Sequence, residues 1–196
     1  MFIGHTAVAF ASKRAAPRAS LGVLMAAVMF VDLIWPIFLL LGVEHVKIAR
    51  GITRFSPLDF SDYPWSHSLV MAIGWSILFA IVYWAVSRYG RGAIVAGACV
   101  FSHWLLDLIV HRADLPILPG NAGGLPLLGF GLWRVPGVAA ELEFAIVAAG
   151  AWLYWRAASE VARGRAPAGF WRQPGALAAS IFVAGVVTLA VDLFVA

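Results

Sequence analysis

The chain has 196 residues, of which 62% are hydrophobic and 12% are charged, whereas soluble domains average roughly 45–50% and ~25%. These proportions exclude an ordinary soluble protein and indicate one integral membrane domain over residues 1–196. The net charge of +4 comes from basic residues scattered through short connections. That pattern is typical of membrane topology, so no nucleic-acid partner is expected. The single cysteine, Cys99, excludes an intrachain disulfide.

The first predicted element is a short helix over residues 2–15, which Pro17 separates from an apolar segment over residues 20–43. The short helix is below the ~20 residues that cross a bilayer, so we expect a helical hairpin whose first arm is re-entrant or interfacial. His5 lies 12 residues before Pro17 and Asp32 lies 15 residues after it. At a rise of about 1.5 Å per residue, the two side chains reach nearly the same depth.

Four more apolar segments follow, at residues 66–87, 92–111, 137–157 and 175–196. Each has about 20 residues, enough for a helix to cross the hydrocarbon core. The predicted fold class is therefore all-α: a polytopic transmembrane helical bundle with five spans and the short N-terminal helix. Membrane lipids are the expected surroundings, and the oligomeric state is left open.

The basic residues predict the orientation of these spans. If residues 13–18 are cytoplasmic, that side carries nine of the 14 Lys and Arg residues and the other side carries five. The positive-inside rule then favours a first span that runs from inside to outside. With this orientation, every histidine or acidic side chain in a span lies between the bilayer midplane and the outer surface. We expect one site in the outer half of the membrane.

The span at residues 92–111 carries the most specific pattern, with His103, Asp107 and His111 at i, i+4 and i+8. Steps of four residues keep all three side chains on one helix face. Imidazole and carboxylate groups are the ligands expected for zinc, manganese or iron. The alternative is a polar seam in which these groups hydrogen-bond between helices. Ionisable groups inside a bilayer generally serve a function, which favours metal or proton chemistry.

Other ionisable residues are candidates for the same site. Asp32 lies between apolar neighbours in a span and needs a partner there. His67 opens the second span, and the alternative is an interfacial histidine at a helix start. His5 joins only through the re-entrant hairpin; without it, His5 is an amino-terminal polar residue. Glu141 and Glu143 are ~200° apart on a helix, so only one can serve as ligand or general base.

Two long loops, residues 44–65 and 112–136, lie on the predicted outer side, where loops of this length often bind ligands. Arg112 and Arg134 flank the site, where they either hold an anionic group such as phosphate or anchor the interface. We expect His45 and Asp59 to be solvated loop residues. Asp192 is expected to be a terminal residue that reaches toward the membrane surface.

Four short motifs give the chain a family resemblance over about residues 1–115. They resemble, in the same order, motifs of the bacterial membrane-bound metal-dependent hydrolases of the LexA-regulated inner-membrane type: Gly4-His5, Asp32-Leu-Ile-Trp-Pro36, Ser66-His67-Ser68-Leu69 and Ser102-His103-Trp-Leu-Leu-Asp107. A more distant similarity is to helical zinc-dependent phospholipases C. The resemblance implies a multi-pass protein of the bacterial inner membrane with a divalent metal ion, zinc first and manganese or iron next.

The chain also departs from the family motifs. Ile34 and Trp35 stand where the family has a second Asp and a His, and Asp62 stands where it has another His. The positions that match are His5, Asp32, Ser66, His67, Ser102, His103 and Asp107. Asp62 and His111 are the residues that would substitute for the missing ligands.

The first functional hypothesis is a metal-dependent hydrolase that acts on a lipid or lipid-linked phosphate or acyl ester. One or two ions would be held by His5, Asp32, His67, His103, Asp107 and His111, with Asp62 and Glu141 as catalytic groups or further ligands. The second hypothesis is a proton- or ion-coupled transporter that uses the same His and Asp residues. The third is a haem or quinone anchor, in which His67 and His103 are axial ligands.

Overall fold

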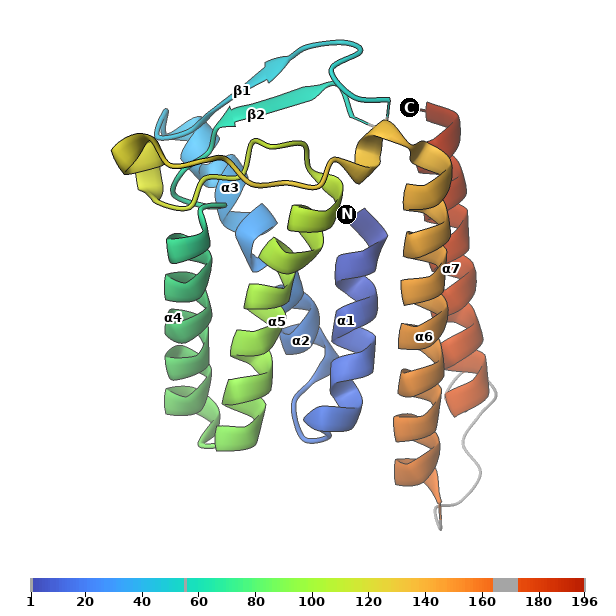
Figure 1. The fold of residues 1–196 in the computed structure, drawn as a ribbon. Helices are drawn as coiled ribbons and strands as arrows, with labels where there is room; N and C mark the ends of the chain where they lie inside the picture. Colours follow the sequence, from blue (N-terminus) through green and yellow to red (C-terminus); the bar gives the residue numbers. More distant parts are fainter. Residues whose placement is uncertain (1, 55, 164–172, 196) are drawn as a thin grey trace.

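The computed structural model describes residues 2–54, 56–163 and 173–195. Nearly parallel and antiparallel helices form a bundle, and one small hairpin lies at one end (Figure 1). The described helices are α1 (Phe2–Ala15), α2 (Leu21–Val28), α3 (Phe30–Leu40), α4 (Leu69–Ser87), α5 (Gly90–Val110), α6 (Pro136–Ala162) and α7 (Pro174–Val195). The predicted all-α polytopic bundle is confirmed.

The candidate membrane spans agree with the predicted segments except for the first. Helices α4, α5, α6 and the described part of α7 are each long and apolar enough to cross a membrane. The predicted span at residues 20–43 is not one straight helix, because α2 and α3 meet at Met29 with a bend of 53°. Ser20 starts α2 by accepting a hydrogen bond from the Val23 N–H. The break leaves the last carbonyls of α2 available for partners outside the helix.

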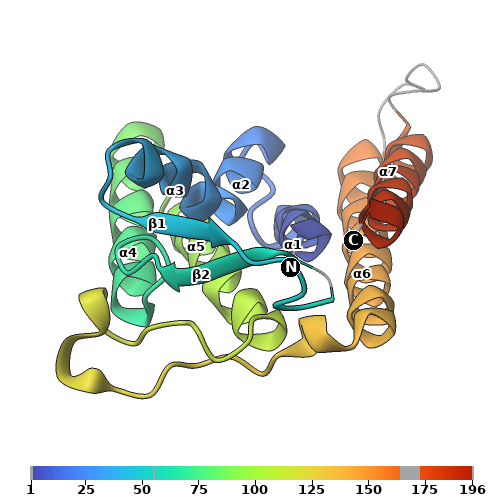
Figure 2. The same cartoon turned by 90° about the horizontal axis from the view of Figure 1, so that it is seen from above.

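Helix α5 is the most buried of the candidate spans. Half of its apolar window is buried within the protein, compared with 6% for α4, whose surface is therefore mostly available to lipid. The helix packs against α4, α2 and α1, and the view from above shows these neighbours around it (Figure 2). Side chains on α5 consequently face protein on several sides, which is where ionisable groups in a span are expected.

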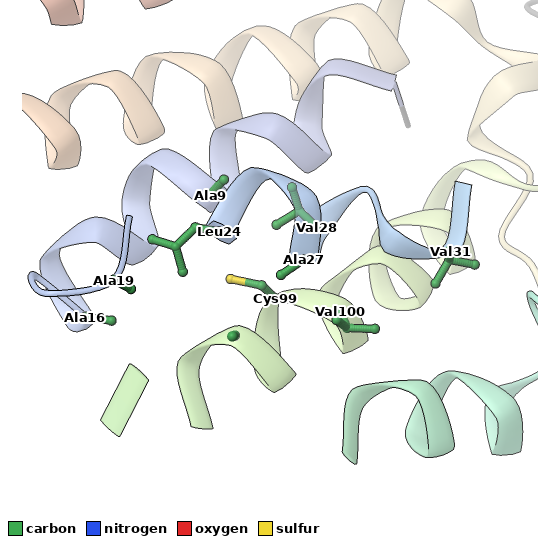
Figure 3. Packing of buried hydrophobic residues seen from close by; sticks show 10 residues of the cluster. Ala9, Ala16, Ala19, Leu24, Ala27, Val28, Val31, Cys99 and Val100 are labelled. Carbon is green, nitrogen blue, oxygen red and sulfur yellow. The ribbon is translucent and has the colours of Figure 1, made fainter. Parts of the chain in front are cut away.

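Small side chains bring α1 and α2 close to α5 (Figure 3). The buried residues of their shared core are Ala9, Ala16, Ala19, Leu24, Ala27, Val28, Val31, Ala96, Cys99 and Val100. Alanine and glycine let helix backbones approach closely where lipid offers little hydrophobic driving force between helices. This packing lets residues from α1 and from the α2–α3 break reach the same level of α5.

The long loops cover one end of the bundle. Residues 44–65, which were predicted as a loop, contain an antiparallel hairpin of β1 (His45–Ile48) and β2 (Leu58–Asp62). Residues 112–136 contain two short 3-10 turns, η1 (Pro119–Gly124) and η2 (Leu132–Arg134). The amino end of α1 and the carboxyl end of α5 lie at this same end (Figure 1).

Candidate metal centre

Helix α5 places three of the predicted residues together. His103 and Asp107 are buried on the helix, and His111 is buried just after its last residue. The His111 N–H still bonds to the Asp107 carbonyl at 2.8 Å, so the chain keeps its helical course up to this point. The prediction that these three side chains share one face is confirmed.

The Asp107 carboxylate is the centre of the cluster, because four histidines turn Nε2 toward it. Oδ1 lies 3.2 Å from the Nε2 of His5 and 4.0 Å from that of His111. Oδ2 lies 3.1 Å from the Nε2 of His103 and 3.9 Å from that of His67. The residues come from three separate parts of the chain, α1, the segment just before α4, and α5, so the predicted convergence is confirmed.

Asp32 adds a second carboxylate from the first turn of α3. Its Oδ1 lies 3.4 Å from the Nε2 of His103 and 3.6 Å from that of His67. The Asp32 side chain is 31% exposed, whereas the other cluster members are buried. Asp32 is therefore the least buried member of the cluster.

Helix α1 supplies His5, whose ring stacks on His103 with centroids 3.8 Å apart and planes 5° from parallel. The start of α1 is held by the buried Glu143 of α6, whose Oε2 accepts the backbone N–H groups of Ile3 and Gly4 at 3.0 and 3.4 Å. A carboxylate at a helix amino terminus satisfies donors that have no partner within the helix. Glu143 thus fixes the position from which His5 enters the site.

The Nδ1 atoms of three histidines are bonded on the outer side of the cluster. His103 Nδ1 lies 2.8 Å from the Val28 carbonyl, at the end of α2. His111 Nδ1 lies 3.1 Å from Asp114 Oδ1, and His67 Nδ1 lies 2.7 Å from Ser66 Oγ. A carbonyl can only accept, so Nδ1 of His103 donates and its neutral ring has a lone pair on Nε2.

With Nδ1 donating to Val28, the Nε2 atom of His103 faces the carboxylates of Asp32 and Asp107. The buried Nε2 has no hydrogen-bond partner among the described residues, although oxygens of Asp107 and Asp32 lie 3.1 and 3.4 Å away. A nitrogen lone pair and carboxylate oxygens repel one another unless a positive charge lies between them. A metal ion or an additional proton would each supply that charge.

The spacing of the inner atoms fits a shared metal ion. Two groups of possible ligands have their atoms within 4.8 Å of one another, His5 with His103 and Asp107, and Asp32 with His67 and His103. Ligands that share one ion through bonds of about 2.0–2.2 Å lie ~3.3–3.6 Å apart in a tetrahedron. Bonded outer nitrogens are also the usual environment of histidines that ligate a metal. The donor set fits a divalent ion such as zinc.

Aromatic rings surround the histidines on the hairpin side. Phe60 and Trp133 pack on His111, with ring centroids 5.1 and 4.5 Å away. Tyr63 packs on His67 at 4.8 Å, and Trp35 meets the same ring edge-on at 6.5 Å. These rings limit water on one side of the cluster, which strengthens electrostatic interactions within it.

Two residues predicted as catalytic do not join the cluster. Glu141 is exposed on α6, because the face of α6 that meets α1 carries Glu143 instead. Asp62 pairs across the hairpin with His45, Oδ2 to Nδ1 at 2.6 Å, and both side chains are exposed. The expectation that His45 is solvated is therefore correct. Neither Glu141 nor Asp62 belongs to the groups of possible metal ligands found among the described residues.

The flanking charged residues are also paired or exposed. Arg112 bonds to Asp59 and, through Nε at 3.0 Å, to Asp114, so its charge is already neutralised and Asp59 is not a free loop residue. Arg134 is exposed. The side chain of Asp192 lies outside the described residues. Of the two flanking arginines, Arg112 is therefore already committed to carboxylates.

Three residues beside the cluster were missed by sequence reasoning. Asp114 supports His111 from three residues further on, a helical spacing that could have suggested it. Glu44 is fully buried at the end of the first span, and an acidic residue directly after an apolar segment was its one signal. Tyr63 is buried and bonds to Asp114, and nothing in the local sequence pattern distinguishes it from an interfacial tyrosine.

No protein-family model, curated protein or solved structure matches this chain. The resemblance to membrane-bound metal-dependent hydrolases therefore stays a prediction.

Proposed function

We propose that this protein is a membrane-embedded metal-dependent hydrolase that acts on a lipid or lipid-linked phosphate or acyl ester. The observation that carries the proposal is the buried Nε2 of His103, which faces two carboxylates with its other nitrogen bonded to a carbonyl. A divalent ion held by the cluster resolves that contact. When bound, such an ion lowers the pKa of a coordinated water and polarises a scissile ester.

The residues have different roles in the proposed site. The two oxygens of Asp107 face separate pairs of histidines, His5 with His111 and His67 with His103, so the cluster has donors for one or two ions. Asp32 completes the second pair and is the partly exposed member. A substrate would therefore approach beside Asp32.

The surroundings of Asp32 support a lipid-like substrate. Leu33 and Ile37 follow on α3, and their side chains are 55% and 53% exposed. An apolar surface next to the open side of the site suits an acyl chain better than a water-soluble molecule. The bacterial inner membrane and a site in its outer half belong to this proposal, and their basis is the sequence resemblance and the distribution of basic residues.

The same contact also supports a second candidate, a proton-coupled transporter. An additional proton on His103, shared with Asp32 or Asp107, would remove the repulsion without a metal ion. The two candidates differ in one measurable property. Only the hydrolase requires a bound metal.

The test is metal analysis of the purified protein together with hydrolysis of two probes, p-nitrophenyl laurate and bis(p-nitrophenyl) phosphate. We expect wild-type protein to retain zinc, manganese or iron in stoichiometric amount and to hydrolyse at least one probe. His103→Ala should lose both properties. The matched control is His45→Ala, because His45 is an exposed histidine outside the cluster. Wild-type protein that holds no metal even after reconstitution would overturn the hydrolase and favour the transporter.

A further inference from the structure

Glu44 and Ser66 form a buried chain of hydrogen bonds behind His67. The Glu44 side chain is fully buried and its Oε1 accepts the backbone N–H groups of Trp65 and Ser66, each at 2.7 Å. Its Oε2 accepts the Ser66 hydroxyl, also at 2.7 Å. Ser66 Oγ in turn lies 2.7 Å from Nδ1 of His67. The chain of contacts runs from a carboxylate through one hydroxyl to a candidate ligand.

The end of α3 explains how Glu44 reaches this position. Gly42 adopts a left-handed conformation with φ of +66°, and its N–H bonds to the Leu39 carbonyl. The next N–H, of Val43, bonds back to Phe38 at 2.9 Å, which completes a Schellman motif. This turn reverses the chain directly before Glu44. The carboxylate is therefore held by a defined helix end.

Counting hydrogens along the chain fixes the tautomer of His67. An ionised carboxylate only accepts, and a hydroxyl has one hydrogen to donate. Since Ser66 donates that hydrogen to Glu44, its oxygen can only accept from Nδ1 of His67. The neutral His67 ring then has its lone pair on Nε2, which faces Asp32 and Asp107.

We propose that Glu44 and Ser66 are positioning residues that hold His67 as the Nδ1–H tautomer, with its Nε2 lone pair directed into the cluster. The benefit to metal binding rests on the proposed function, whereas the tautomer does not. Outer partners of ligating histidines fix both the ring orientation and the tautomer, and their loss typically lowers metal affinity roughly 10–100-fold.

Glu44→Gln gives the sharpest test, because it keeps the shape of the side chain and reverses the direction of hydrogen-bond donation from residue 44 through Ser66 to His67. The Gln carbonyl would take the two backbone N–H groups, so its amide group would donate to Ser66. The Ser66 hydrogen would then turn to Nδ1 of His67 and force the hydrogen of the ring onto Nε2. An Nε2–H group cannot ligate a metal ion.

The measurement is the ¹⁵N spectrum of histidine-labelled, metal-free protein in nanodiscs, with the His67 signals assigned by their absence in His67→Gln. We expect a protonated Nδ1 in wild type and a protonated Nε2 in Glu44→Gln. Ser66→Ala, a second variant, should lose the uniform Nδ1–H state, and Ser66→Thr should restore it. The matched control for the tautomer alone is Glu143→Gln, which should leave the His67 signals unchanged, because this buried carboxylate also accepts two backbone N–H groups but supports α1 and His5 instead of His67.

A titration with Zn²⁺ completes the experiment. Apparent affinity should fall roughly 10–100-fold in Glu44→Gln and remain near wild type in Ser66→Thr. An unchanged His67 tautomer in both Glu44→Gln and Ser66→Ala, or a protonated Nε2 in wild type, would overturn the inference. If the tautomers change as expected and wild type binds no zinc, the positioning role stands and the proposed hydrolase fails.

Discussion

At the scale of single residues, Tyr63 joins the candidate metal centre to the polar network at the end of the bundle. Its hydroxyl donates to Asp114 Oδ1 at 3.2 Å, and that carboxylate also supports His111. Burial, followed by the negative charges of Asp114 and Asp107, raises the pKa of Tyr63 well above its usual value. The phenol therefore stays protonated in the folded protein at pH values where an exposed tyrosine ionises.

This shift makes a prediction for alkaline pH. The unfolded chain releases the Tyr63 proton near pH ~10 while the folded protein retains it, so stability declines as the pH rises above that value. In Tyr63→Phe, the thermal midpoint should fall less between about pH 8 and about pH 10.5 than it does in wild type. Tyrosinate absorbance is the direct check. If Tyr63→Phe removes absorbance from the folded protein below about pH 10.5, the shifted pKa is wrong.

The spacing of residues in the sequence predicted the cluster residues on α5 better than the residues that hydrogen-bond to the outer nitrogens of the histidines. The four-residue spacing of His103, Asp107 and His111 fixed a shared face, because helix geometry alone determines it. Glu44 lies outside the helices and has no periodic partner, so only the folded loop brings it to Ser66 behind His67. Asp114 lies three residues after His111, but it follows the end of α5, where the helical pattern no longer applies. The choice between the two α6 glutamates depended on which face meets α1, and a single helix does not reveal its neighbours.

At the scale of elements, Glu143 is expected to anchor α1 on α6. Replacing it with Ala would leave the buried N–H groups of Ile3 and Gly4 without this acceptor, at about 1–3 kcal/mol for a buried unsatisfied group. We expect Glu143→Ala to lower the thermal midpoint and to weaken zinc retention through His5. The control is Glu141→Ala, two residues away and exposed, which should behave as wild type. Equal effects of the two variants would contradict the anchoring role.

Close packing of α1 on α6 gives a second element-scale prediction. A Cβ atom at Gly150 would lie 2.6 Å from the Ala7 carbonyl oxygen and 3.0 Å from the Ala7 Cβ, so the two helices would have to separate. Gly74 on α4 has nothing within 4 Å of the same position. We expect Gly150→Ala to lower the thermal midpoint and Gly74→Ala to maintain or raise it, since alanine favours helix. A stable Gly150→Ala protein with unchanged metal content would show that this contact can relax.

The sequence predicted the long helices, but it did not predict the bend between α2 and α3 or the two short strands. Long apolar runs determined α4 to α7, because the bilayer requires about 20 residues of helix. The bend at Met29 has no proline or glycine at the break and was not foreseen. Strands β1 and β2 are only four and five residues long, inside a segment that was interpreted by its length alone.

At the scale of the whole molecule, the two ends of the helical bundle differ in their connections. The hairpin and the loop at residues 112–136 lie at the same end of the bundle as α3, the helix that carries Asp32 (Figure 1). The opposite end carries the short connection between α4 and α5, where Arg88 caps α4 in a left-handed conformation. Orientation in the membrane therefore decides which compartment the site faces.

The nine-to-five distribution of Lys and Arg predicts that the short connections are cytoplasmic and the hairpin end is outside. A reporter fused after Arg91 should therefore be active inside the cell, and one fused after Ala196 should be active outside. Charge reversal at the basic connections provides the control, because replacing Arg88 and Arg91 with Glu should weaken this preference if positive charge sets it. The reverse pattern of the two fusions would move the candidate metal centre to the cytoplasmic half of the bilayer and leave its internal geometry unchanged.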